Sequence, residues 1–152
     1  MTQKTVSLAM AAAALACIDP DAYAASTVTT GWVSADNFQD FMGVVLAGDL
    51  GTNATLDAKI EQATSAAGAG AKDITGAAIT QLTQAGGDSN KQAIIAFSSS
   101  DLDANGGYTH FRLSMTVGTA TSDAAALVLG ATPRFGPASG DDASTVVEIV
   151  TV

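Results

Sequence analysis

The sequence predicts a mainly β protein, an antiparallel β-sandwich of jelly-roll-like form that carries an Ala-rich N-terminal helix or arm. Three observations predict this fold class. Short β-prone segments recur at a spacing of roughly ten residues through the second half of the chain. Loops rich in Gly, Asp and Asn separate these segments. The segment from Tyr108 to Val117 alternates apolar and polar side chains, as a half-buried strand does.

Length and composition indicate a single domain. The chain has 152 residues, which is enough to bury a core. We expect residues 1–29 to form the N-terminal helix or arm, residues 30–139 the β-sandwich body and residues 140–152 a C-terminal tail or strand. Hydrophobic residues make up 47% of the chain, much of it alanine, and aromatic residues only 5%. Burial of apolar surface stabilises a fold by about 25 cal/mol per Å², and alanine buries little such surface. We therefore predict a thin core that neighbouring subunits help to stabilise.

The charge of the chain argues against two classes of partner. Fifteen acidic and six basic side chains give a net charge of −9, which repels phosphate backbones and anionic membrane surfaces. The basic residues are scattered and form no run or helical stripe. We therefore expect neither nucleic acid nor a membrane as a partner. Cys17 is the only cysteine, which excludes an intrachain disulfide and a cysteine cluster for zinc.

The N-terminal segment has the order of features found in a secretory signal. Lys4 precedes an apolar run from Val6 to Ile18, and Ala22-Tyr23-Ala24 follows as a small-residue cleavage pattern. The run is shorter than the ~20 apolar residues that cross a bilayer. We expect it to stay in the protein as an Ala-rich helix or arm that packs on the body or on a neighbour.

The first strands of the body are predicted by apolar runs and by alternation. Phe41 to Ala47 is apolar throughout and rich in Val, which predicts a short, fully buried strand. Thr55 to Ala63 fits both a helix, from its intrinsic propensity, and a strand, from its period of two. Because strand periodicity dominates downstream, we predict a strand here, with Asp57, Lys59 and Glu61 facing outward.

The other elements follow from turn residues and β-prone runs. In order, we expect a small-residue turn at Ala66–Ala71, a strand or short helix at Asp73–Thr83, strands at Lys91–Ser98, Tyr108–Val117 and Ala124–Gly130, an irregular extended segment at Pro133–Gly140, and a β-prone tail at Thr145–Val152.

The sequence contains no catalytic motif. His110, the only histidine, lies on the polar side of its predicted strand, and the residues around it supply no nucleophile with an orienting carboxylate. The chain also lacks a nucleophile elbow, a phosphate-binding loop, a dinucleotide fingerprint and a zinc-protease motif. We predict that the protein is not an enzyme and uses no cofactor, and that His110 is a surface or interface residue.

One loop shares half of a calcium-binding pattern. Asp101, Asp103, Asn105 and Gly106 match the first half of an EF-hand loop, which gathers oxygen ligands. The twelfth position, however, is Arg112, a cation where calcium needs a bidentate glutamate, and the flanking segments predict strands. We expect no metal, and Asp and Asn side chains that cap backbone amides.

A stiff segment near the C-terminus has the chemistry of a contact site. Arg134 lies between Pro133 and Phe135, and a guanidinium held in this way suits bidentate pairing with a carboxylate of a partner. The alternative is an ordinary surface arginine.

Three stretches together resemble a group of small virion proteins of tailed bacteriophages, encoded among head-morphogenesis genes. The first, 55–83, combines a K-x-E-like strand and a small-residue turn with a D-[VI]-x-G-A segment at Asp73–Ala77. The second, 101–118, has the aromatic-Arg-Leu core Phe111–Leu113, and the third, 125–139, has the Pro-Arg-aromatic segment at Pro133. The resemblance covers Thr30 to Ser139, and its motifs are structural.

The resemblance implies a virion structural protein on the capsid surface. Such a protein is a capsid cement or decoration protein, a homo-oligomer that binds and stabilises the shell of the major capsid protein. Two alternatives stay open, a head-to-tail joining or tail structural protein and a secreted surface or adhesion module. We expect the partner-binding residues to be Trp32, Arg112, Pro133, Arg134 and Phe135.

Overall fold

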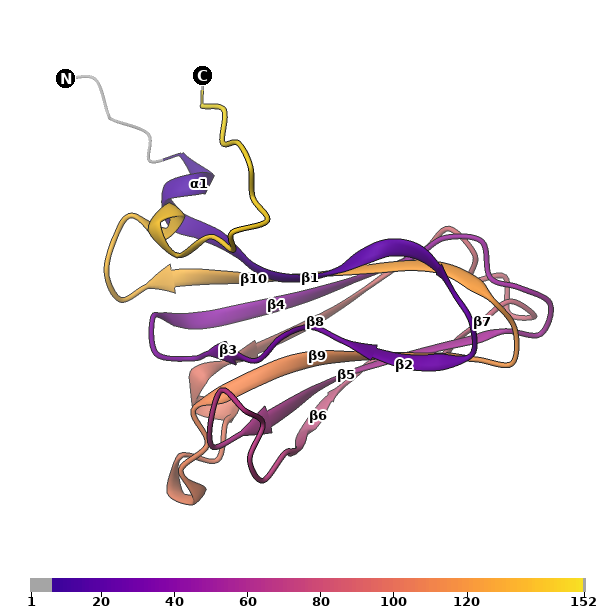
Figure 1. Ribbon diagram of the computed structural model, residues 1–152, viewed down its shortest axis with the longest axis horizontal. Helices are drawn as coiled ribbons and strands as arrows, with labels where there is room; N and C mark the ends of the chain where they lie inside the picture. The colour runs from indigo at the N-terminus through magenta and orange to yellow at the C-terminus, as the bar shows by residue number, and fades with distance from the viewer. Residues whose placement is uncertain (1–6, 152) are drawn as a thin grey trace.

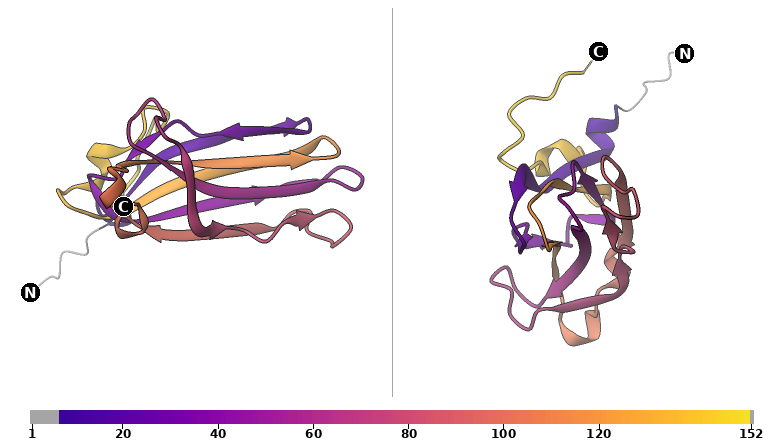
Figure 2. Two further views of the ribbon diagram at one scale, coloured as in Figure 1. Left: turned by 90° about the horizontal axis from the view of Figure 1, so that it is seen from below. Right: turned by 90° about the vertical axis from the view of Figure 1, so that its right-hand side faces the viewer.

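The computed structural model describes residues 7–151, which fold into two antiparallel β-sheets packed face to face. Figure 1 shows the two layers, and Figure 2 shows that the sandwich is elongated along its strands. Within the described residues, no helix has the length and apolar character that crossing a membrane requires.

Each sheet is built from segments that are far apart in the sequence. Sheet A has the order β1 (Ala12–Tyr23), β10 (Ser122–Pro133), β4 (Phe38–Ala47) and β8 (Gln92–Ser98). Sheet B has the order β2 (Ser26–Thr29), β9 (His110–Gly118), β5 (Thr55–Ala63) and β6 (Lys72–Ala78), with β3 (Val33–Ser34) beside β9 and β7 (Leu82–Thr83) beside β5. The connections include the short helix α1 (Leu8–Ala11) and the 3-10 turns η1 (Ser99–Asp101), η2 (Ala104–Gly106) and η3 (Ala138–Asp141).

The strand pairing is that of a jelly roll. β2 and β3 both pair with β9, and β6 and β7 both pair with β5, so each of these two sets is one interrupted strand. The remaining pairs nest, because β1 pairs with β10, β2 with β9, β4 with β8 and β5 with β6. The chain is thus a long hairpin rolled into two sheets, the eight-stranded jelly-roll arrangement. The predicted fold class is confirmed.

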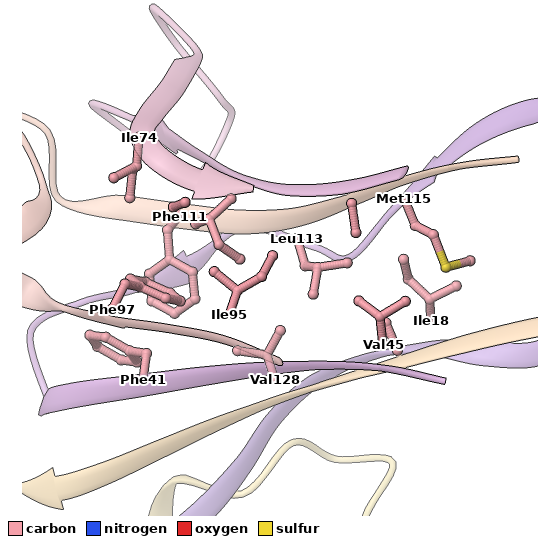
Figure 3. Close-up of a cluster of buried hydrophobic side chains, with 14 of the residues drawn as sticks. Ile18, Phe41, Val45, Ile74, Ile95, Phe97, Phe111, Leu113, Met115 and Val128 are labelled. Atoms are coloured by element: carbon pink, nitrogen blue, oxygen red, sulfur yellow. The ribbon is translucent and has the colours of Figure 1, made fainter. Parts of the chain in front are cut away.

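The core lies between the sheets and contains more large side chains than the composition suggested. Phe41, Phe97 and Phe111 pack together at one end, with ring centroids 4.6 to 5.3 Å apart (Figure 3). Leu113 and Met115 of β9 continue the core with no exposed surface. Buried alanines, such as Ala58 and Ala126, fill the remaining core positions.

The strand predicted at Thr55–Ala63 is confirmed as β5, with the same bounds. Leu56 and Ile60 are fully buried, while Lys59 and Glu61 lie on the outer side. β5 is hydrogen-bonded to β9 on one side and to β6 and β7 on the other. Two sets of ladder bonds therefore outweigh the helix propensity of this stretch.

The other predicted strands are present, with shifted bounds. Lys91–Ser98 corresponds to β8, Tyr108–Val117 to β9 and Ala124–Gly130 to the longer β10, while the segment Asp73–Thr83 forms β6 and β7 and no helix. The predicted turn at 66–71 is also present, and Gly68 and Gly70 have positive φ there.

The N-terminal segment differs from the expected helix or arm. Within residues 7–29, helix is limited to the four residues of α1, and β1 pairs with β10 from Ala12 opposite Ala131 to Tyr23 opposite Ser122. Residues 12–29 therefore belong to the sheets of the sandwich. Alanine is the strongest helix former, but intrinsic propensity is a small term, and the pairing with β10 overrides it. Register shifts interrupt the pairing beside Leu15 and Pro20, and Lys4 and Val6 lie outside the described residues.

The C-terminal segment is a tail without a strand between η3 and residue 151. Ala14 is its anchor, since the amide of Ala14 donates to Asp142 Oδ1 at 2.7 Å and its carbonyl accepts from the amide of Ala143 at 2.7 Å. β1 is an edge strand of sheet A, so backbone groups on its outer edge have no partner strand and are free for these bonds. The tail and α1 lie at the same end of the sandwich (Figure 1).

Candidate interaction surfaces

The expected partner-binding residues fall into two separate places. Trp32 and Arg112 lie on the outer side of sheet B, and Pro133, Arg134 and Phe135 lie where β10 ends. A third surface, the outer face of sheet A, was not among the candidates.

Arg112 is held by contacts within the chain. It lies directly opposite Glu61 in the β5–β9 register, and its Nε donates to Glu61 Oε2 at 2.7 Å. Its guanidinium carbon stacks 4.6 Å from the centroid of the Trp32 ring. Gly68 also packs against the indole, since an added Cβ there would lie 2.5 Å from Trp32 Nε1. The cluster joins the turn at 65–70 to the outer face of sheet B.

The outer face of sheet B is polar and its charges are paired. Lys59 Nζ lies 2.7 Å from Asp73 Oδ1 and 3.3 Å from Glu61 Oε1. The hydrogen bond to Asp73 is the main cause that raises the pKa of Lys59 above its ordinary value. Asp57 accepts a hydrogen bond from Gln81 Nε2 at 2.7 Å. The predicted outward row of Asp57, Lys59 and Glu61 is therefore confirmed. These side chains form part of the solvent-facing side of sheet B.

The EF-hand-like loop has capping bonds in place of a cation cage. Asp101 Oδ2 accepts from the amide of Ser98, and Asp103 Oδ1 accepts from the amide of Gly106 at 2.9 Å. Asp103 Oδ2 accepts from Lys72 Nζ at 2.7 Å, and this bond is the main cause that lowers the pKa of Asp103. Across residues 7–151, no three His, Cys, Asp or Glu side chains converge on a point where a metal could bind.

His110 has a local hydrogen bond. Its Nδ1 lies 2.9 Å from Thr109 Oγ1, and its strand position faces Ser34 of β3 and Ala63 of β5. In the described part of the chain, the side chain of Thr109 is its one hydrogen-bonding partner, so no carboxylate orients the ring. Among residues 7–151, no nucleophile and carboxylate are hydrogen-bonded to the ring as a catalytic set requires.

Arg134 differs from the other cations of the described residues. Lys59, Lys72, Lys91 and Arg112 each have a carboxylate oxygen within 3.3 Å, whereas in the 7–151 range Arg134 has no carboxylate partner. Its amide donates to the carbonyl of Asn37 at 2.8 Å, which fixes the backbone where β10 ends.

An exposed aromatic ring accompanies this free charge. The next residue, Phe135, is 77% exposed. Arginine and aromatic side chains dominate the binding energy of many interfaces, and here the two types are adjacent and exposed.

The central part of the outer face of sheet A is apolar across all four strands, and polar residues lie at its two ends, namely Asp40 and Ser98 at one and Gln92 and Asp123 at the other. Its side chains alternate with the core residues of the same strands, and directly paired residues share the face. We call these ten residues the apolar face: Ala14, Cys17, Met42, Val44, Leu46, Ile94, Ala96, Ala125, Leu127 and Leu129. None is charged, and Leu46 and Ile94 are 42% and 61% exposed.

The sequence analysis did not predict this face, because a continuous apolar run is normally interpreted as a strand that is buried on both faces. The run at Phe41–Ala47 predicted a strand buried on both sides, and only one side of β4 is covered by the core. The uninterrupted apolar run is itself evidence for an apolar outer face. A strand with one face in solvent has polar residues at alternate positions, and this run has none.

A hollow of about 450 Å³ lies at the end of the apolar face where β10 begins. Pro20, Leu46 and Ala125 are among its apolar lining residues, and Asp21 and Asp123 add two carboxylates. Both carboxylates belong to exposed residues, and within the described chain neither takes part in a salt bridge. Because β10 runs the length of the sheet, the hollow and the Arg134–Phe135 pair lie at opposite ends of one strand.

Comparisons with known proteins identify no family. No protein-family model matches the sequence, and no curated protein matches it significantly. Similar solved structures include a chain of broad bean stain virus, with 17% identity, a TM-score of 0.38, and coverage of 74% of this chain and 62% of that chain. A chain of infectious bursal disease virus, Gx strain, has 13% identity and a TM-score of 0.41, with 84% of this chain and 34% of that chain covered.

A chain of the naturally occurring empty particles of cowpea mosaic virus is also similar, with 9% identity, a TM-score of 0.39, and coverage of 70% of this chain and 57% of that chain. This protein therefore spans between about a third and two thirds of the three viral chains. With TM-scores below 0.5, these likenesses assign no family and no function to the chain.

Proposed function

We propose that the protein is a bacteriophage capsid cement or decoration protein, which binds the shell of the major capsid protein at the capsid surface and stabilises it. The observation that carries this proposal is the contrast between the two outer faces of the jelly roll. Sheet A presents the uncharged apolar face, and sheet B presents paired charges. A protein that joins unlike neighbours needs two such chemically different surfaces. The sequence resemblance to small phage virion proteins supports the same assignment.

Binding alone accounts for the stabilising effect. A ligand that binds the assembled shell and not its separated subunits adds its binding free energy to the stability of the shell. The first and the last strand, β1 and β10, pair with each other in sheet A, so the strand pairing of the chain itself closes the body that makes these contacts.

We place the contact with the shell on the outer side of sheet B, around Trp32 and Arg112. These side chains are of the types that contribute most to interface energies. The ion-paired side chains around them keep this face solvated in the free protein. On binding, these side chains can form ion pairs with charged groups of the shell instead.

The test compares purified phage particles that contain or lack this protein. Particles without it should release their genome at a lower temperature, and adding the purified protein should restore the higher value. Addition of a Trp32→Ala protein should restore it less, while a Thr27→Ala protein, altered elsewhere on the same outer sheet, should act as wild type. Equal rupture temperatures with and without the protein contradict the proposal.

The number of copies per particle separates this function from a head-to-tail joining role. A cement protein follows the many symmetry-related positions of the shell, whereas a joining protein forms one ring. Quantitative gel densitometry against the major capsid protein gives the ratio, and a value that fits a single ring overturns the cement assignment.

A further inference from the structure

We propose that the apolar face of sheet A is the interface between two copies of this chain, related by a twofold axis. This inference goes beyond the proposed function, because it concerns the protein before any shell is present.

The sequence pattern of the two central strands indicates that both of their faces are buried. Val45 and Val128 point into the core, and their neighbours Val44 and Leu127 point outward and are equally apolar. An antiparallel sheet with one side in water normally carries polar residues at the outward positions. Sheet B follows that rule with Lys59 and Glu61, so the departure is specific to sheet A.

The size of the apolar face can be set against that of a protein interface. Its residues span five positions on β4 and on β10, and four strands at a spacing of about 4.8 Å and five residues at about 3.3 Å each give a flat area of about 300 Å². A monomeric soluble protein rarely exposes an apolar patch of more than a few hundred Å². A stable interface takes about 800 Å² from each partner, so the two ends of sheet A and their loops supply the rest of the contact.

A second copy is the occupant that is present whenever the protein is. An exposed apolar face leads to aggregation unless another surface covers it. Before the protein meets a shell, a second copy of the chain is the surface that can cover it. The net charge of −9 makes most of the surface repel another copy. The ten residues of the apolar face are uncharged, and the nearest carboxylates, such as Asp40 and Asp123, lie at its two ends, so the centre of this face is where two acidic chains repel each other least.

The ends of the face are complementary under a twofold axis. When two copies of β10 face each other and run in opposite directions, the end of one lies over the beginning of the other. Arg134 then reaches the partner's Asp123, and Phe135 reaches the partner's hollow. The contact is made twice, and it supplies carboxylates to the one cation that has none within residues 7–151.

The mass of the full-length protein in solution, without any shell, tests the interface. Sedimentation equilibrium should give twice the chain mass of 15.1 kDa, which is about 30 kDa. Leu127→Lys and Ile94→Lys should each raise the dissociation constant of the dimer at least tenfold, because each places two like charges in the interface. Ile94 is 61% exposed in the monomer, so this variant keeps its fold. Thr116→Lys, on the outer side of sheet B, should leave the dimer unchanged.

A charge swap tests the orientation of the two copies. Arg134→Asp and Asp123→Arg should each weaken the dimer, and the double variant should regain most of the wild-type affinity. Within one chain the two positions lie at opposite ends of β10, so such a rescue requires contact between copies. A monomeric wild type, or an assembly whose mass the Leu127→Lys and Ile94→Lys substitutions leave unchanged, overturns the proposal. Additive losses without rescue reject the twofold arrangement. None of these measurements involves a shell, so they fail or succeed independently of the cement function.

Discussion

Arg112 lies across the β5–β9 ladder from Glu61, and its Nε donates to Glu61 Oε2 at 2.7 Å. The two side chains are 28% and 15% exposed, so this pair is the least solvated of the ion pairs of the described chain. Lys59 binds the other carboxylate oxygen of Glu61 at 3.3 Å. The strength of the pair determines how firmly the outer surface of sheet B is held.

The Glu61–Arg112 pair is expected to stabilise the fold measurably. Glu61→Gln and Arg112→Gln should each lower the free energy of unfolding by about 1–2 kcal/mol, since each leaves a half-buried group without its partner. A double-mutant cycle by urea denaturation measures the coupling, which should be about 0.5–1 kcal/mol. Lys91→Gln, at an exposed pair, is the control and should change stability by less than about 0.5 kcal/mol. A coupling of zero between positions 61 and 112 would refute the contact.

Gly68 is expected to tolerate no side chain. It has a φ of +80°, and a Cβ would lie 2.5 Å from Trp32 Nε1. Gly68→Ala should therefore destabilise the protein by about 1–3 kcal/mol and shift the emission of Trp32, the only tryptophan.

Gly87 supplies the matched control for this substitution. It has a φ of +78° and no atom within 4 Å of an added Cβ. Gly87→Ala should thus cost only the backbone strain, about 1 kcal/mol, and leave the emission unchanged. Equal losses for the two variants would show that the indole gives way.

The buried phenylalanines are expected to carry much of the stability. Phe111 is fully buried, and its ring centroid lies 4.6 Å from that of Phe41. Phe111→Ala should lower the free energy of unfolding by about 3–5 kcal/mol, because it leaves a cavity between the sheets. Phe135→Ala, with the ring 77% exposed, should change monomer stability by less than about 0.5 kcal/mol. Urea denaturation at protein concentrations below the dimer range compares the two, and a small loss for Phe111→Ala would contradict the packing.

Acid is expected to weaken the Asp103–Lys72 contact. The hydrogen bond from Lys72, followed by that from the Gly106 amide, lowers the pKa of Asp103 below its ordinary value of 3.8. A carboxyl with a depressed pKa in the folded state adds stability above its unfolded pKa. That contribution is lost as the pH falls through the folded value. Between pH 5 and pH 2, the midpoint temperature of thermal unfolding should therefore fall less steeply in Asp103→Asn than in wild type. Equal slopes for the two proteins would contradict the lowered pKa of Asp103.

The sequence predicted those strands that have one polar side. β5 and β9 alternate strictly, so their inward residues Ile60 and Leu113 and their outward residues Glu61 and Arg112 could be named in advance. β1 could not be predicted in this way. Its residues are mostly small, and nothing local distinguishes a helix from a strand until β10, more than a hundred residues later, supplies the ladder.

The partner-binding residues were predictable only as residue types. Arg112 and Arg134 are both arginines beside aromatic residues. The fold gives Arg112 the carboxylate of Glu61 from a strand some fifty residues away, and in the described chain it gives Arg134 none. Local sequence cannot tell these two cases apart, because the difference depends on strand register. Their roles toward a partner stay predictions.

The nesting of the strands also sets the order in which the chain can fold during synthesis. β10 is the last strand made, and it lies between β1 and β4 as the one partner of β1 in sheet A. Until β10 leaves the ribosome, β1 has no partner strand in sheet A, and β4 can pair only with β8 on one edge. Pairings this distant in sequence form slowly. A ribosome that stalls before Ser122 therefore releases a chain that cannot close sheet A and that exposes its most apolar strands to aggregation.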